Sequence, residues 1–91
     1  MTTFNTAAAP KAPAYVESIW QMEVNPTYIR FKFKTEEAAA EMYAETKNDD
    51  KDPMIAAVTL TDKVVAIHYA DHSAVPHIAK AISEAYGIEM I

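Results

Sequence analysis

The feature that most constrains the fold is the stretch 20–34, WQMEVNPTYIRFKFK, in which apolar and polar residues alternate on both sides of a turn signal. Alternation with a period of two is typical of β-strands that bury one face. Asn25, Pro26 and Thr27 supply the turn chemistry, so the stretch predicts a β-hairpin. Its expected buried residues are Trp20, Met22, Val24, Ile29, Phe31 and Phe33.

The register of this hairpin follows from turning both apolar stripes inward, because a one-residue slip would turn each side chain to the other face. In this register Glu23 lies opposite Arg30 on the outer face, as a cross-strand pair of opposite charge. The expected inward pairs are Val24 with Ile29, Met22 with Phe31 and Trp20 with Phe33.

The rest of the chain predicts a helix, a second hairpin and a second helix. Thr35 is a good N-cap for an Ala-rich helix over 36–47, and Gly87 is a good stop for the last helix. The second hairpin spans 54–70, and its expected inward residues are Met54, Ala56, Val58, Leu60, Val65, Ile67 and Tyr69.

A shift of 36 residues aligns the apolar positions of the first half with those of the second half. The chain therefore reads ββα twice, which predicts an α+β two-layer sandwich with a four-stranded antiparallel sheet and both helices on one face. If the last strand fills the gap in the central βαβ unit, the strand order is 1-2-4-3, a permuted ferredoxin-like plait. The alternative is a different order of the two hairpins in the sheet.

Composition sets the domain organisation and the expected location. Residues 1–14 are rich in Ala, Thr and Pro and predict a flexible N-terminal tail, while 15–91 predict one domain. The chain has no cysteine and no apolar run near the roughly 18 residues of a membrane span, so we expect a cytoplasmic protein with no membrane contact. The net charge of −5 disfavours a nucleic-acid partner.

The sequence gives little indication of a catalytic, metal or cofactor site. A single glycine excludes Gly-rich phosphate loops. The aspartates of 48–53 lack the spacing of a calcium loop. His68, His72 and His77 fall on a strand, a loop and an outer helix face, so we do not expect them to converge on zinc. We therefore expect no catalytic residue, metal or cofactor.

The sheet face opposite the helices is the expected interface, since an exposed patch of small apolar residues beside a basic stripe commonly marks one. A protein partner or a second copy in a homodimer would cover it. On the first helix Glu37, Glu41 and Glu45 form an acidic stripe, which suits water or a basic partner. The predicted interface residues are Ile19, Tyr28, Arg30, Lys32, Ile55, Ala57, Thr59, Ala66 and His68.

The sequence thus favours a non-enzymatic protein-interaction module that binds through the open sheet face or an edge strand. Small acidic domains of this kind are frequent among phage accessory proteins, which suggests an inhibitor or adaptor of a larger host machine. One alternative is a homodimeric small-ligand-binding or catalytic domain with a pocket at the dimer seam. Another is a single-stranded nucleic-acid binder, for which Tyr28 beside Arg30 and Lys32 gives a faint signal.

Overall fold

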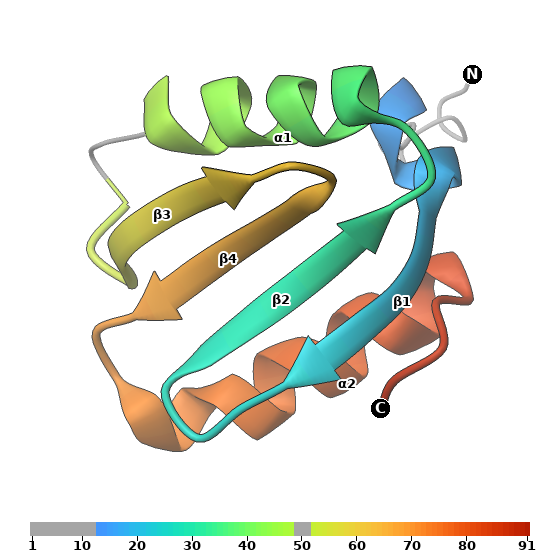
Figure 1. Ribbon diagram of the computed structural model, residues 1–91. Coiled ribbons are helices and arrows are strands. Elements are labelled where there is room, and N and C mark those ends of the chain that lie inside the picture. The colour runs from blue at the N-terminus through green and yellow to red at the C-terminus, as the bar shows by residue number, and fades with distance from the viewer. Residues whose placement is uncertain (1–12, 49–51) are drawn as a thin grey trace, which may run out of the picture.

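The computed structural model describes residues 13–48 and 52–91, and its elements follow the predicted ββαββα order (Figure 1). A 3-10 helix, η2 (Ala14–Ser18), precedes the hairpin of β1 (Ile19–Val24) and β2 (Tyr28–Phe33). Helix α1 (Glu36–Asn48) leads to the second hairpin, β3 (Ile55–Thr61) and β4 (Val64–Tyr69). A short 3-10 turn, η3 (His72–Ala74), leads into α2 (Val75–Tyr86). The first twelve residues of the predicted tail, and 49–51 of the aspartate-rich loop, lie outside the described residues.

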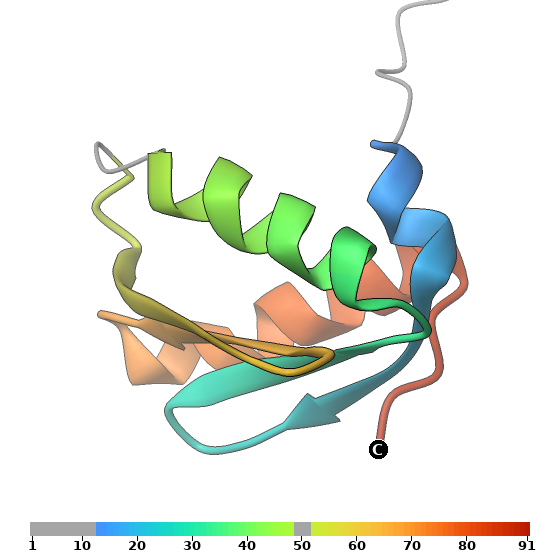
Figure 2. The same ribbon diagram turned by 45° about the horizontal axis from the view of Figure 1, so that its top comes forward.

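The strands form one antiparallel sheet in the order β1-β2-β4-β3, which confirms the predicted sandwich and its strand order. Helix α2 lies behind β1 and β2 in Figure 1. Figure 2 shows the β3–β4 hairpin edge-on, with α1 above it. Both helices cover the same face, on which the central strands bury alternate residues: Ile29, Phe31, Phe33, Val65, Ile67 and Tyr69. The arrangement fits a ferredoxin-like plait.

Helix α1 begins, and helix α2 ends, where the sequence indicates. The hydroxyl oxygen of Thr35 accepts a hydrogen bond from the Ala38 backbone N–H at 3.2 Å, which satisfies one free donor of the first turn of α1. Ala38 and Ala39 are buried, so α1 approaches the sheet closely. Gly87 ends α2 with φ at 67°, in the left-handed region that favours glycine.

The first hairpin has the predicted register beside its turn, but the prediction for Trp20 is wrong. A bulge between Ile19 and Gln21 places Ile19, rather than Trp20, opposite Phe33. An extra residue in one strand reverses the facing of every residue beyond it. Ile19 is therefore buried at 9% exposure, while Trp20 is 48% exposed. The residues before Ile19 form η2 instead of extending the strand.

The same irregularity recurs in the second hairpin, 36 residues later. The bulge lies between Ile55 and Ala57, so Ile55 pairs with Tyr69 and packs against the core, and the expectation that it faces outward is wrong. Ala56 is the extra residue and is exposed rather than buried. Strands β2 and β4 are also offset by 36 residues, so the two ββα units match down to the position of the bulge.

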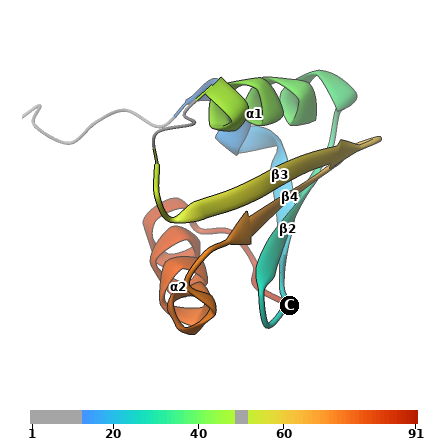
Figure 3. The same cartoon turned by 90° about the vertical axis from the view of Figure 1, so that its left-hand side faces the viewer.

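The two edges of the sheet differ. The C-terminal segment covers β1: the Met22 N–H donates to the Glu89 carbonyl at 2.9 Å, and the Ile91 N–H donates to the Met22 carbonyl at 2.9 Å. Met90 forms a parallel bridge with Met22 in this contact. Strand β3 forms the opposite edge and runs across the front of the sheet in Figure 3, with α1 above it. No described segment pairs with its outer side.

Candidate functional site

The sheet face turned away from α1 and α2 is the candidate site, and we call it the open face. Seven of the nine predicted interface residues lie on it; Ile19 and Ile55 do not, because the bulges turn them to the helix side. Cross-strand pairing and alternation define the open face as Trp20, Gln21, Glu23, Tyr28, Arg30, Lys32, Ala57, Thr59, Thr61, Val64, Ala66 and His68.

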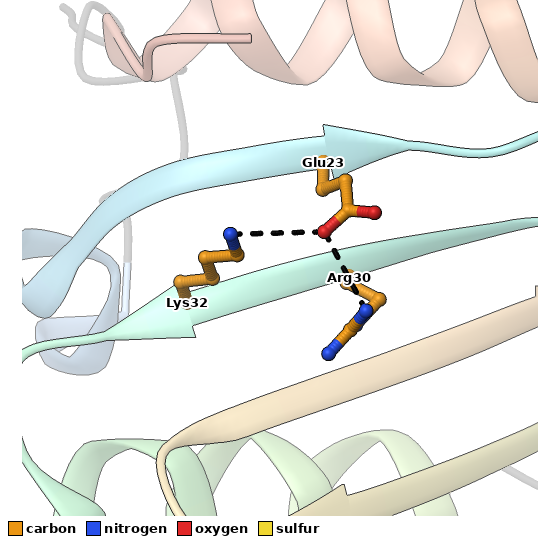
Figure 4. Close-up of polar contacts among 3 residues, drawn as sticks. All are labelled: Glu23, Arg30 and Lys32. Carbon is orange, nitrogen blue, oxygen red and sulfur yellow. Dashed lines mark ion pairs between the residues drawn. The ribbon is translucent and has the colours of Figure 1, made fainter. Parts of the chain in front are cut away.

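A charge cluster occupies the β1–β2 half of the open face (Figure 4). The Glu23 Oε1 atom lies 3.6 Å from Arg30 Nη1 and 3.7 Å from Lys32 Nζ. The predicted Glu23–Arg30 pair is thereby confirmed. Because all three side chains are partly exposed, each contact contributes less than about 1 kcal/mol to folding stability. The main effect of Glu23 is to reduce the positive charge of this half.

Aromatic rings lie on both sides of this cluster. The rings of Tyr28 and His68 stack across β2 and β4, with centroids 4.8 Å apart and planes at 28°. The Lys32 Nζ atom lies 5.9 Å from the centroid of the Trp20 ring, a cation–π contact. Trp20 is the candidate site residue that sequence reasoning missed. Because Trp20 and Met22 are two residues apart, alternation predicts that both side chains are buried. No residue type at this position indicates the bulge that turns Trp20 outward.

The β3–β4 half of the open face carries no Lys, Arg, Asp or Glu side chain. Its residues are small or short: Ala57 and Thr59 on β3, and Val64 and Ala66 on β4. A partner could therefore approach this half closely, without displacing long side chains. The open face combines a charged aromatic half with a small, uncharged half.

A cavity of about 240 Å³ lies on the other side of the sheet, between α1, α2 and η2. Its lining is mostly apolar and includes Ile19, Phe31, Met42 and Ile82. Burial raises the pKa of Tyr69, which also lines the cavity, to about 12, and the charge of Asp52 adds to the effect. Neither a carboxylate nor an imidazole lines the cavity, so it presents no group suited to general-base catalysis at neutral pH.

Tyr15 ties the 3-10 helix to the acidic stripe of α1. Its hydroxyl donates to the Glu45 carboxylate at 3.1 Å. Burial, followed by this hydrogen bond, raises the pKa of Tyr15 to about 12. Glu37 and Glu41 are exposed along the same helix. The acidic stripe therefore belongs to the helix side of the molecule and is separate from the open face.

The histidines that suggested zinc lie on different elements: His68 on β4, His72 in η3 and His77 on α2. Within 13–48 and 52–91, no group of three His, Asp or Glu side chains is placed to hold a metal ion. In the same ranges, no helix has the length and apolar character needed to cross a membrane.

Comparison with protein-family models, with curated proteins and with solved structures finds no match for this chain. The class of protein is therefore defined by its fold, an α+β sandwich with a permuted ferredoxin-like plait, and by its open face.

Proposed function

We propose that the protein is a non-enzymatic interaction module that binds another protein through its open face. The observation that carries the proposal is a sheet face, covered by no described element, on which Arg30 lies between Tyr28 at one end of the hairpin and Trp20 at the other. Trp, Tyr and Arg are the residue types that most often dominate the binding free energy of protein interfaces. Small apolar residues on the same face would let the partner surface pack closely.

The charges of the open face define the chemistry of the partner surface. Glu23 lies between Arg30 and Lys32, so the cluster is positive, negative and positive within one small area. A protein surface with carboxylates around one basic group complements this pattern, and its apolar part would cover Ala57 and Ala66. Complementary charges of this kind set specificity and association rate more than affinity.

In this proposal the domain acts by occupying a surface of its partner. In this proposal the protein is an inhibitor or adaptor of a larger host machine, of the type found among phage accessory proteins. The cavity on the helix side supports this over a catalytic role, because its lining offers no carboxylate or imidazole. The cavity also lies within one chain and does not correspond to a pocket at a dimer seam.

The test is a charge placed at the uncharged half of the open face. Ala66→Glu should weaken binding of the purified partner at least about 30-fold, since a buried charge without a counter-ion costs roughly 2–5 kcal/mol. The partner is first captured from host lysate and then titrated by calorimetry. Ala40→Glu, the same change on the exposed side of α1, is the matched control and should bind as the wild type does. Equal affinity of the Ala66→Glu variant and the wild type would overturn the proposal.

The second candidate is a single-stranded nucleic-acid binder. It is favoured by the stacked Tyr28 and His68 rings and by Trp20 beside Lys32, since such proteins stack bases on aromatic rings next to basic residues. The net charge of −5 and the carboxylate of Glu23 oppose it. Nuclease treatment of the lysate before capture separates the two candidates.

A further inference from the structure

Strand β3 is an unprotected edge of the sheet. The opposite edge, β1, is covered by the backbone of Glu89 and Ile91, whereas no described segment pairs with the outer side of β3. Edge strands commonly avoid pairing with other chains by carrying charged residues or proline. The sequence of β3, IAAVTLT, contains neither. Beyond the bulge at Ala56, the segment 57–61 is regular and free to pair.

The pairing of β3 with β4 determines which backbone groups of β3 are free. The strands are joined by the two-residue turn Asp62–Lys63, so Thr61 and Val64 form a hydrogen-bonded pair. Hydrogen-bonded pairs alternate in an antiparallel ladder, which makes Thr59–Ala66 the next one. The N–H and C=O groups of the residues between, Val58 and Leu60, therefore point away from β4.

The side chains of Val58 and Leu60 are incompletely buried at this edge. Val58 and Leu60 pair with the core residues Ile67 and Val65, so their side chains lie on the helix-covered face. Val58 nevertheless remains partly exposed, and Leu60 is 36% exposed. An additional strand with apolar residues on this face would complete their burial.

Helix α1 adds a flank of complementary charge above the edge. Met42 lines the cavity and Glu45 contacts Tyr15 of η2, so these residues face away from the edge. Helical spacing places Glu36 and Lys47 on the opposite flank, above the outer side of β3. This flank is acidic at the start of the helix and basic at its end.

We propose that β3 pairs antiparallel with β3 of a second copy, about a two-fold axis at Thr59. Val58 of each copy then lies opposite Leu60 of the other, and the two sheets become one continuous eight-stranded sheet. The axis also makes the two α1 helices antiparallel, so that Glu36 of each copy meets Lys47 of the other. A second copy fits because the same two-fold operation pairs the free backbone groups, covers the partly exposed Val58 and Leu60, and brings the opposite charges of the two α1 helices together. The inference does not rest on the proposed function, since both open faces stay free.

The mass in solution tests the pairing. At about 100 µM, sedimentation equilibrium should give twice the chain mass of 10.1 kDa. Leu60→Lys places an ammonium group in the apolar seam and should weaken dimerisation at least tenfold. Ala81→Lys, at an exposed position of α2 on the β1–β2 side of the molecule, is the control and should remain dimeric. A monomeric wild type, or a Leu60→Lys variant that dimerises as tightly as the wild type, would overturn the proposal.

A cross-linking experiment tests the position of the axis without destabilising the core. The chain has no cysteine, so Thr59→Cys introduces a single thiol. In the proposed pairing two Thr59 residues form a non-hydrogen-bonded pair with Cα atoms about 4.5 Å apart, within reach of a disulfide. Diamide, the oxidant, takes two electrons and two protons from the two thiols as the S–S bond forms. The Thr59→Cys variant should cross-link to a covalent dimer.

The matched control is Thr61→Cys. Thr61 lies opposite Ala57 of the second copy, so two Thr61 residues are about 13 Å apart along the seam and should not cross-link. A circular dichroism spectrum like that of the wild type verifies that each variant is folded. Equal cross-linking of the two variants, or none in Thr59→Cys, would overturn the proposed pairing.

Discussion

Trp20 and Phe31 are large aromatic residues of the same hairpin with opposite surroundings, since Trp20 is 48% exposed and Phe31 is 1% exposed. Trp20→Ala should therefore lower the free energy of unfolding by less than about 1 kcal/mol, and Phe31→Ala by roughly 3–5 kcal/mol. Because Trp20 is the only tryptophan of the chain, its fluorescence reports this site alone. We expect a solvent-like emission maximum. A blue-shifted maximum, or similar losses in the two variants, would contradict the bulge at this position.

Tyr69 makes stability depend on pH in the alkaline range. Burial raises its pKa from 10.0 to about 12 in the folded protein. Above pH 10 the unfolded chain loses this proton first, so the stability contributed by the protonated hydroxyl falls progressively between pH 10 and pH 12. The fall amounts to roughly 2–3 kcal/mol. Urea denaturation at pH 8 and pH 11 should show that the free energy of unfolding falls less with pH for Tyr69→Phe than for the wild type. Equal decreases in the two proteins would contradict burial of the Tyr69 hydroxyl as the cause.

At the scale of the elements, the two bulges are the feature that alternation cannot predict. Ile19 and Trp20 are adjacent and both apolar, so either could face the core. The fold selects Ile19, which lines the cavity beside Tyr15 and Val16 of η2. Where strand pairing is regular, alternation placed the open-face residues of β2 and β4 correctly. Beyond each bulge it placed Ile19 and Ile55 on the wrong face.

The bulge in β3 predicts an unusual tolerance to deletion. Removing Ala56 leaves Ile55 facing inward and Ala57 outward, because Ala56 is the extra residue of the pair. The deleted chain should therefore unfold cooperatively, with a stability close to that of the wild type. Removing Thr59 instead turns Val58 to the open face and should cost roughly 1.5–3 kcal/mol for lost burial. Thermal denaturation of the two deletions compares them directly, and an equal loss in both would show that β3 has no bulge.

At the scale of the whole molecule, residues 13–48 and 52–91 present three surfaces of different chemistry. The open face has clustered charges and aromatic rings, the β3 edge has free backbone groups, and α1 carries an acidic stripe. Pairing at the β3 edge would place two open faces side by side on one sheet. A partner with two equivalent sites would then bind the dimer more tightly than the monomer, without any new contact on the open face.

A direct titration decides whether the open face binds protein or nucleic acid. Together Glu23, Arg30 and Lys32 carry a charge of about +1 on a chain of net charge −5, so few phosphates can be neutralised there. We expect oligo(dT) to leave the fluorescence of Trp20 unchanged at about 150 mM salt.

Removing the carboxylate with Glu23→Gln makes the cluster more basic, and any binding at low salt should then show a salt slope no steeper than about −1.4, since two cations are involved. Quenching of the wild type at physiological salt, lost in Tyr28→Ala, would assign the Tyr28–His68 stack to base recognition. The open face would then be a nucleic-acid surface, because a protein-binding face has no reason to respond to a single strand through that ring.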